Sequence, residues 1–398
     1  MTVARTTTEV EALRSLWRSL PVSNLDADID YFMTVVTHHP EVIAPHVVCI
    51  ERDGRPPLLI VARLEAHPFP VKIGYREFLR PRLRAIVVSF DGILGASSDD
   101  DLRACLLALQ ESLRAGFADA VIFQKVTLRS SLHEALLESA GAGSRVHGIA
   151  STTRWLVDLP ETMDEFMGRR SPGARRKART DERRLRRTYN DEVSVVRLDE
   201  SGLEALRADL ETVSSKTYQR ALGVGGSTTD VGKALIGLCL ERGWLRVWML
   251  YLESKPVAFW WGNLYGGVLT IDSPGFDPQF TKDGVGIHTM YAMFAELCAD
   301  PLATAVDLGH GDAEYKIRYS TRSLEQQDMV LLARRPGPLL VGSFISGALT
   351  LNKLAYRALR GSRFANRLRR AWRSRLTSSA TEAESPSTDT AGSTDTAG

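Results

Sequence analysis

Short apolar runs bounded by polar and turn-forming residues predict strands in the first 160 positions. The runs His46–Glu51 and Pro57–Leu64 flank Asp53-Gly54, a dipeptide that favours a hairpin turn. Asp99–Phe117 instead has apolar residues at helical spacing, and its three opening aspartates suit a helix N-terminus. The other elements predicted here are the strands Arg84–Phe90, Ala120–Val126 and Thr152–Leu159 and the helix Ser131–Ser139.

The second part of the chain repeats this order of elements. A hairpin is again followed by a strand, a loop, a helix, a strand, a helix and a strand, which predicts a mixed α/β fold built from two similar units. The predicted helices are Ala174–Thr188, Gly202–Thr217, Val231–Arg242, Val285–Cys298 and Ala313–Tyr319. The predicted strands are Val193–Leu198, Leu245–Leu252, Val257–Leu264, Gly267–Asp272, Thr304–Leu308 and Glu325–Ala333.

Composition divides the chain into four parts. The two units are expected at residues 1–160 and 161–335, and a basic helical extension follows at 336–376. Residues 377–398 are rich in Ser, Thr, Ala and Gly and carry no basic residue, so a disordered tail is expected there.

The formal net charge of +2 conceals two cationic segments on an acidic remainder. Arg169–Arg187 holds nine Arg and one Lys against two acidic residues, and Leu331–Leu376 holds eleven basic residues and no acid. Such asymmetry favours anionic partners.

The cysteines argue against a disulfide framework and against a metal site. Cys49, Cys105, Cys239 and Cys298 lie far apart, with no C-x-x-C pair. The N-terminus lacks the apolar core of a secretory signal, and no apolar stretch reaches the roughly 20 residues that span a bilayer. A cytoplasmic protein is therefore expected.

The segment Leu269–Glu296 carries the first candidate site. A strand leads through a loop to Gly284 and Gly286 and then into a helix. Glycines at such a turn let backbone N–H groups approach a phosphate, and the helix N-terminus adds partial positive charge. The alternative is a tight loop without a ligand.

The segment Val306–Ser320 carries the second candidate site. Its strand ends at a Gly-His-Gly turn, Asp312 is expected to cap the next helix, and Tyr315 and Lys316 follow. Asp312 and Lys316 are four residues apart and are expected to pair. These groups at a strand end form an acid–base set, and the alternative is a capped surface helix.

Three blocks together resemble the GNAT acyltransferases. They are the Arg-rich helix Arg175–Arg187, the loop Phe276-Asp277-Pro278-x-Phe280, and Asp307-Leu308-Gly309-x-Gly311-Asp312-x-x-Tyr315-Lys316. The closest branch holds the CelD-type tandem-domain proteins, which are related to the Fem aminoacyltransferases. The resemblance covers roughly Met163–Arg334. It implies two tandem GNAT-like units, each a twisted mixed sheet flanked by helices.

The resemblance also implies a mechanism and its residues. The donor is acetyl-CoA or another acyl-CoA, held near Thr281, Gly284, Val285, Gly286, Ile287 and His288, and no metal is required. Thr281 departs from the Gln or Arg usual at its position. Tyr315 is expected to protonate the leaving thiolate, and Asp272 or Asp312 to accept the amine proton, with Lys316 beside them. Since Asp99–Asp101 would repel a pyrophosphate, the first unit is expected to be non-catalytic.

Four further residues are candidates for substrate binding. Arg175 and Arg179 are expected to contact an anionic donor or acceptor, although a solvated basic face is the alternative. Nucleic acid is disfavoured because no aromatic residues interleave the arginines. Trp260 is expected as core or groove wall, with carbohydrate stacking as its alternative. His310 completes the set.

The C-terminal extension has two interpretations. Apolar residues in Pro338–Leu359, followed by Arg360–Arg375, suit an amphipathic helix on the inner face of an anionic membrane. The alternative is a helix packed on the protein with its arginines in water.

The expected function is transfer of an acyl group to an amine on a sugar or a cell-envelope or polysaccharide precursor. Two alternatives stay open: Fem-like transfer from an aminoacyl-tRNA, and a non-catalytic binding or scaffold protein at the membrane.

Overall fold

The structure is a computed structural model that describes residues 1–73, 76–198, 203–216 and 229–359. Two compact bodies are distinguished along the chain, Met1–Leu349 and Thr350–Gly398. The first body contains both of the predicted units. The expected tail at 377–398 and the arginines of 360–376 lie outside the described residues.

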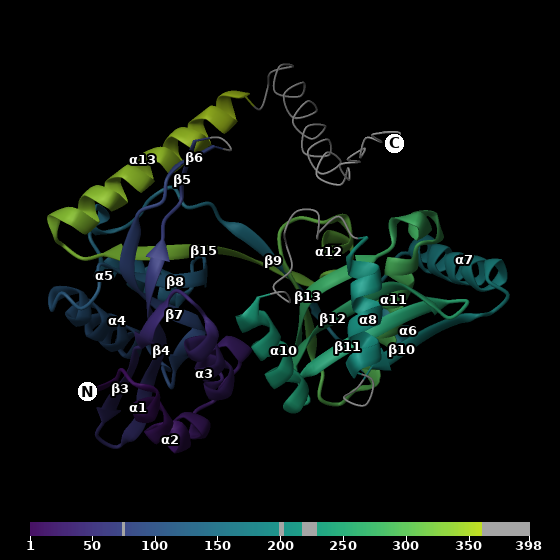
Figure 1. Cartoon of the computed structure of the whole chain (residues 1–398), viewed down its shortest axis with the longest axis horizontal. Coiled ribbons are helices and arrows are strands. Elements are labelled where there is room, and N and C mark those ends of the chain that lie inside the picture. Colours follow the sequence, from purple (N-terminus) through teal and green to yellow (C-terminus); the bar gives the residue numbers. More distant parts are fainter. Residues whose placement is uncertain (74–75, 199–202, 217–228, 360–398) are drawn as a thin grey trace, which may run out of the picture. The chain divides into compact units, whose positions relative to one another are not determined.

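The predicted elements are present, with boundaries that shift by a few residues, and the mixed α/β fold class is confirmed (Figure 1). The strands are β1 (Thr2–Ala4), β2 (Val42–Pro45), β3 (Val47–Arg52), β4 (Arg55–Pro68), β5 (Val71–Ile73), β6 (Arg76–Leu79), β7 (Arg82–Leu94), β8 (Ala120–Thr127), β9 (Thr152–Asp158), β10 (Val193–Leu198), β11 (Leu245–Leu252), β12 (Lys255–Tyr265), β13 (Val268–Phe276), β14 (Ala305–His310) and β15 (Arg322–Leu332). The helices are α1 (Thr7–Ala12), α2 (Arg14–Ser19), α3 (Ile29–His38), α4 (Asp99–Arg114), α5 (Ser131–Ser139), α6 (Met163–Gly168), α7 (Pro172–Thr188), α8 (Leu203–Ser214), α10 (Asp230–Glu241), α11 (Val285–Ala299), α12 (Glu314–Tyr319) and α13 (Pro336–Leu359), with 3-10 turns η1 (Leu25–Ala27), η2 (Ala142–Ser144) and η5 (Pro278–Asp283).

The N-terminal elements β1 and α1 to α3 are not predicted by the apolar pattern. Helices α1 and α2 have six residues each, too few for a helical period to stand out. Local capping defines α1 instead: the Thr6 hydroxyl accepts the Glu9 N–H, and the Glu9 carboxylate accepts the Thr6 N–H. Trp17 and Phe32 then anchor this region in a core of its own.

One mixed sheet of thirteen strands runs through both predicted units in the part of the chain that the structure describes. Its order is β1-β3-β4-β7-β8-β15-β9-β14-β13-β12-β11-β10, with β2 paired to β4. Strand β15 lies between β8 and β9, antiparallel to both, and β9 in turn pairs with β14. The last strand of each predicted unit therefore also borders a strand of the other unit, and the unit boundaries stay a prediction.

Alternate residues of the first unit's strands bury on opposite faces of the sheet. Ile60, Ile86 and Val121 pack under α4 and α5, whereas their neighbours Val87 and Ile122 pack on the other face, where Ile345 of α13 joins them. This period of two is the pattern that a sheet covered on both faces requires.

The second unit is also covered on both faces. Trp248 and Trp260 pack with Phe294 of α11 and Phe166 of α6. On the opposite face, Met249 and Phe259 pack with residues of α8 and α10. The sheet and α11 together position the candidate site.

Candidate functional site

Strands β13 and β14 separate at the centre of the second unit. They pair in parallel only from Val268 to Thr270, opposite Ala305 to Asp307, although β13 continues to Phe276 and β14 to His310. We call the gap beyond these pairs the seam. Helix α11 follows β13 through the turn η5, so its N-terminus belongs to the same βα connection.

A β-bulge makes Asp272 the extra residue of β13 beside the seam. Trp261 pairs with Ser273, and the next residue, Gly262, already pairs with Ile271. The bulge brings the β13 backbone against β12, where a side-chain Cβ at Gly262 would collide with the Thr270 carbonyl. Bulges of this kind re-aim a side chain next to functional sites.

The N-terminus of α11 has no side-chain cap. Gly284 holds the N-cap position in the left-handed region, with φ 69° and ψ 27°. Ile287 and His288 donate their N–H groups back to the Gly284 carbonyl at 3.1 and 3.0 Å. The Val285 and Gly286 N–H groups belong to the first turn, which leaves them without helical acceptors and available to an anion.

The corresponding helix of the first unit, α4, is closed to an anion. The Ser98 hydroxyl accepts the Asp101 N–H at 3.2 Å, and the Asp101 carboxylate accepts the Ser97 N–H at 2.9 Å. The Ser97 N–H, together with Arg52, lowers the pKa of Asp101 to about 2, so this carboxylate stays ionised. The side chains of α4 thus fill the position that α11 leaves open.

Trp260 forms the wall between the α11 N-terminus and α12. Its ring is 3% exposed, and its Nε1–H donates to the Gly286 carbonyl at 2.9 Å. The Tyr315 ring packs edge-on against it, with centroids 5.4 Å apart at 85°. Burial raises the pKa of Tyr315 to about 12, so its hydroxyl keeps its proton at neutral pH.

The Lys316 side chain reaches from α12 to the end of β14. Its ammonium donates to the His310 carbonyl at 2.7 Å, and burial lowers its pKa. A Cβ at Gly309 would lie 3.6 Å from Lys316 Nζ and 4.0 Å from the Ile271 carbonyl, so Lys316 and β13 approach each other at the seam.

Residues of β15 and β9, the two strands where the units meet, hold His310 and Asp307 in place. The His310 Nε2 lies 2.8 Å from Gln326 Oε1 of β15, and burial lowers the pKa of His310. Arg154 of β9 forms a 2.7 Å ion pair with Asp307, which also accepts the Gly309 N–H at 2.8 Å. Neither Arg154 nor Gln326 was predicted from the sequence.

Asp312 differs from its expectation. Ala313, not Asp312, is the N-cap of α12, and no side chain caps that helix. Among the described residues, Asp312 and Lys316 form no ion pair, because the Lys316 ammonium donates to His310 instead. Asp312 is exposed at the rim, one turn before Tyr315 and Lys316.

Asp272 is the candidate base with the most strongly altered environment. Asp272 is exposed to solvent, but nearby protein atoms still desolvate its carboxyl, and this desolvation together with Asp26 raises its pKa to about 6. The Asn263 amide donates to its carboxylate at 2.9 Å. At neutral pH Asp272 is therefore ionised yet basic enough to accept a proton.

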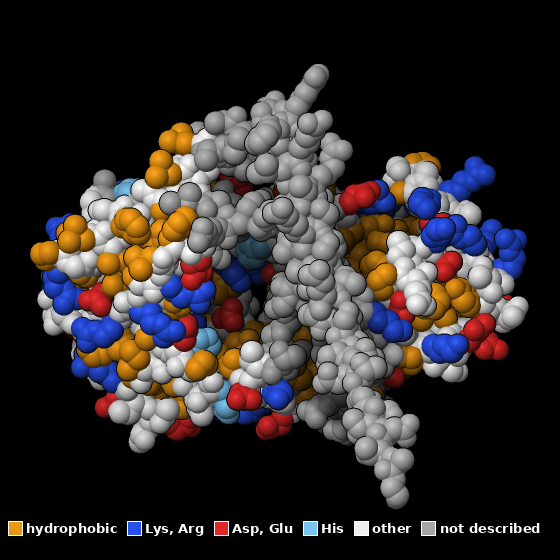
Figure 2. Space-filling view, turned by 45° about the horizontal axis from the view of Figure 1, so that its top comes forward, with side chains coloured by type: hydrophobic (Ala, Val, Ile, Leu, Met, Phe, Trp, Pro, Cys, Tyr) orange, Lys and Arg blue, Asp and Glu red, His pale blue; other side chains and the backbone are white. Residues whose placement is uncertain are grey.

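The Arg-rich helix α7 contacts the donor loop. Arg184 donates to the Lys282 carbonyl at 3.0 Å, and the Tyr189 hydroxyl donates to Asp283 at 3.0 Å. Figure 2 shows Lys and Arg side chains gathered over the region of α7. Contact with η5 places these cations near the N-terminus of α11.

Arg175 and Arg179 lie on one flank of α7. They recur with Glu182 and Arg186 at i, i+4, i+7 and i+11, so the four share a face. Glu182 and Arg186 interact electrostatically with His288, whose pKa burial lowers. Thr281 is exposed and turns its hydroxyl to the Pro278 carbonyl at 2.6 Å.

Trp260 links the α11 N-terminus to Tyr315, and Lys316 meets His310 at the end of β14. Asp272 lies on the other strand of the seam, with Asn263 and Asp26 as its neighbours. Among the described residues, no group of three His, Cys, Asp or Glu side chains could hold a metal ion. An anion-accepting helix N-terminus, an ionised carboxylate and a protonated phenol suit transfer of a group between two bound substrates.

Comparison with known proteins shows that part of the chain matches one protein family. Residues 173–317 match the family described as Acetyltransferase (GNAT) domain. The crystal structure of FemX is 13% identical with a TM-score of 0.58, over 86% of this chain and 100% of that chain. A conserved protein of unknown function from Bacteroides thetaiotaomicron is 14% identical with a TM-score of 0.50, over 83% of this chain and 100% of that one. At such identities these structures share the fold. Among curated proteins none matches the sequence.

The raised pKa of Asp272 predicts a pH-dependent effect on stability. The folded protein favours the neutral Asp272 carboxyl. The contribution of this group to the free energy of unfolding is therefore complete below its ordinary pKa of 3.8 and is lost as the pH rises through about 6. Asp272→Asn should therefore raise the free energy of unfolding more at pH 8 than at pH 4, by on the order of 1 kcal/mol because solvent reaches the group. Urea unfolding at both pH values measures this. Asp100→Asn, at an exposed site, is the control, and an equal change for Asp272→Asn at both pH values would contradict the assignment.

Proposed function

Because residues 173–317 match the Acetyltransferase (GNAT) domain family, we propose that this chain transfers an acyl group, acetyl in the simplest case, from a CoA thioester to an amine. One observation carries the proposal: the uncapped N-terminus of α11 lies directly beyond the strand that borders the seam. Only one of the two similar units has this combination, since Asp101 fills the N-terminus of α4.

The donor pyrophosphate would bind at the start of α11. The Val285 and Gly286 N–H groups offer two donors, and the helix dipole favours negative charge there. Arg175 and Arg179 lie on the flank of α7 that leads to His288, so they would meet the phosphates of the nucleotide. Thr281 and Ile287 are exposed on either side of Gly284, where they would contact the donor.

The thioester would lie along the seam, between Asp272 and Tyr315. Attack of the amine forms the new C–N bond and breaks the C–S bond. Asp272 accepts the amine proton, with exposed Asp312 as the alternative, and Tyr315 supplies a proton to the departing thiolate. The Lys316 ammonium adds positive charge at the end of β14, near the position where the reacting carbonyl gains negative charge.

The acceptor amine is proposed to belong to a sugar or to a cell-envelope or polysaccharide precursor. A second donor class, an aminoacyl-tRNA, is favoured by one observation, the exposed arginines of α7. Calorimetry with acetyl-CoA separates the two, since an enzyme that uses only aminoacyl-tRNA would not bind it.

Ile287→Glu tests the donor site while sparing the fold. Ile287 is 38% exposed and lies in the first turn of α11, where a carboxylate is compatible with the helix but repels a pyrophosphate. We expect acetyl-CoA to bind the wild type and to bind Ile287→Glu about tenfold or more weakly, by calorimetry at low salt. Ile287→Gln has the same shape without the charge and is the control. Equal affinities for the Glu and Gln variants would reject the site, and no binding to any of the three would reject the CoA donor.

Tyr315→Phe tests the proton donor. Removal of the hydroxyl should lower kcat by about 100-fold while KM for the donor changes little, because general acid catalysis acts in the transition state. Tyr291→Phe is the matched control, since Tyr291 lies in the same core but its hydroxyl bonds Tyr319 at 2.6 Å. Steady-state turnover at saturating donor measures both variants. Wild-type turnover in Tyr315→Phe would remove Tyr315 from the mechanism.

We also propose that α13 docks on an anionic membrane. No helix in the described ranges has the length and apolarity needed to cross a bilayer. One face of α13 rests on the first unit's sheet through Ile345 and Ala348, but Leu340 and Phe344 on another face are 71% and 54% exposed. The basic residues that follow in the sequence would add attraction to anionic lipid.

Vesicle co-sedimentation of the full chain tests this docking. The double variant Leu340→Ser with Phe344→Ser should pellet several-fold less than the wild type with vesicles that contain phosphatidylglycerol. Leu107→Ser is the control, because Leu107 is 57% exposed on α4. Equal pelleting of the wild type and the double variant would reject α13 as the docking element.

A further inference from the structure

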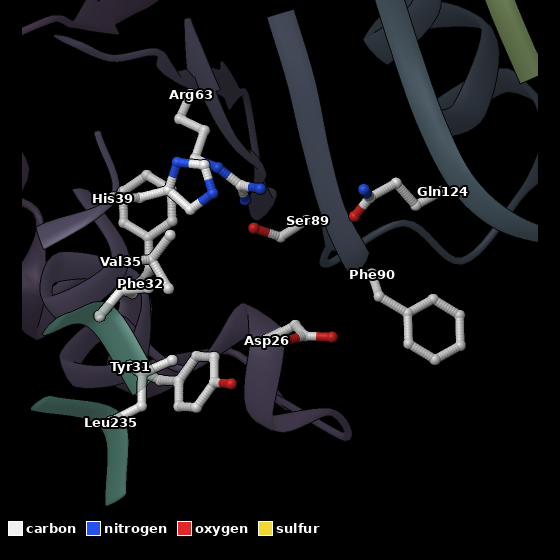
Figure 3. Close-up of a pocket in the computed structure, with 11 residues that line it drawn as sticks. Asp26, Tyr31, Phe32, Val35, His39, Arg63, Ser89, Phe90, Gln124 and Leu235 are labelled. Carbon is white, nitrogen blue, oxygen red and sulfur yellow. The ribbon is translucent and has the colours of Figure 1, made fainter. Parts of the chain in front are cut away.

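A cavity lies outside the donor site, between elements of the first unit and α10 of the second. It measures about 210 Å³ and is bordered by η1, α3, β4, β7, β8 and α10 (Figure 3). At about 30 Å³ per water it could hold roughly seven waters or a short aliphatic group. The proposed acyl transfer assigns it no ligand.

The cavity opens where two parallel strands of the first unit end their pairing. Strands β7 and β8 pair from Ala85 to Val88, opposite Ala120 to Phe123. The next residues on each strand, Ser89 and Gln124, both line the cavity. The first unit therefore has its own opening between strands, but its helix α4 is capped by Ser98 and Asp101 and offers no phosphate site.

Ser89 indicates that the cavity is built for a polar ligand. Its side chain is 5% exposed, and its Oγ has no hydrogen-bond partner. In Figure 3 this oxygen points into the space between Asp26, Arg63 and His39. Burying a hydroxyl without a hydrogen-bond partner costs free energy. A ligand that forms a hydrogen bond with Ser89 would remove this cost and bind more tightly.

The carboxyls around the cavity would be stabilised in their ionised form by a bound cation. The Asp26 carboxyl lines it, and among the described residues no hydrogen bond or ion pair to that carboxyl is seen. Burial raises the pKa of Asp26 and of nearby Asp91, and Asp26 interacts electrostatically with Asp272. Arg63, Arg154 and Lys125 lower the pKa of Asp26, and Arg154 lowers that of Asp91, but burial has the larger effect on both.

The neighbouring arginines do not cancel this charge. Arg63 is paired with buried Glu65 at 2.6 Å, and Arg154 with buried Asp307 at 2.7 Å. Lys125 is the remaining nearby cation, and its ammonium lies 5.6 Å from the centroid of the Phe90 ring. With their carboxyls ionised, the charge around Asp26, Asp91 and Asp272 is therefore negative, and a bound cation would favour that ionised form.

We propose that this cavity binds a protonated primary amine of the acceptor, and that the acceptor is a molecule with more than one amine. An ammonium has three donors and no acceptor, which matches the oxygens of Asp26, Ser89 and Gln124. Phe32, Val35 and Leu235 supply an apolar wall for the attached carbons. Since Asp26 interacts with Asp272, an amine held here would leave a second amine free to reach the proposed base. The link to the acceptor rests on the proposed function, whereas the binding of a cation does not.

Calorimetry on the full chain at pH 7.5 and low salt tests the cavity, with 1,5-diaminopentane as the probe and 1,5-pentanediol as its neutral counterpart. The diamine should bind the wild type at least about tenfold more tightly than the diol. Asp26→Asn should weaken diamine binding by about tenfold or more, and Ser89→Ala by a smaller factor. Asp100→Asn, an exposed carboxylate on α4, is the control and should leave binding unchanged.

Several outcomes would overturn the proposal. Absence of diamine binding, equal binding of the diol, or equal losses in Asp26→Asn and Asp100→Asn would each do so. Tighter binding of inorganic phosphate than of the diamine would assign the cavity to an anion instead. Circular dichroism checks that each variant is folded, and Ser89→Ala keeps the test open if Asp26→Asn is not.

Measuring diamine binding and acetyl-CoA binding separately distinguishes a wrong cation site from a wrong proposed function. Diamine binding without acetyl-CoA binding would reject the proposed acyl-CoA reaction but support the cation site. Acetyl-CoA binding without diamine binding would support the proposed reaction and reject the cation site. If both bind, acylation of 1,5-diaminopentane should exceed that of n-pentylamine, and Asp26→Asn should abolish the difference; equal acylation of the two amines by the wild type would reject the two-amine acceptor.

Discussion

The site depends on two parallel strands that pair for three residues and then separate. Backbone groups that leave a sheet ladder must find other partners or face a ligand. Here the bulge at Asp272 comes two residues after the last pair with β14, and Gly262 permits it because no larger residue fits against the Thr270 carbonyl. That separation creates the seam, and Lys316 reaches it from α12.

Two helix N-termini show how similar units come to differ in chemistry. Both α4 and α11 follow a long strand through a loop, and both units open between parallel strands. A Ser and an Asp close the first helix, whereas Gly284 leaves the second without a cap. The difference is a matter of which side chains satisfy the first-turn N–H groups, not of backbone topology.

Sequence reasoning predicted the elements well because apolar runs bounded by Gly, Pro and Asp report local structure. The glycines before α11 and the acidic start of α4 could also be interpreted, since capping is local. Arg154 with Asp307, and Gln326 with His310, could not be predicted, because their pairing depends on strand order. The environment of Asp272 likewise depends on Asp26 from the N-terminal region, whose short helices have too few residues to show a period. Asp312 failed as a cap because Ala313 takes that position.

The insertion of β15 between β8 and β9 has a consequence for how the chain folds. Gln326 and Gln327 pair with Thr127 and Val126, so the first unit's sheet is incomplete until residues near the end of the described chain have been synthesised. Until then β8 and β9 present unpaired edges, which are prone to aggregation. Contacts of such long sequence separation also slow folding, because loop closure must precede them. During translation, the β8 edge of the first unit's sheet therefore stays unpaired until β15 is synthesised about 200 residues later.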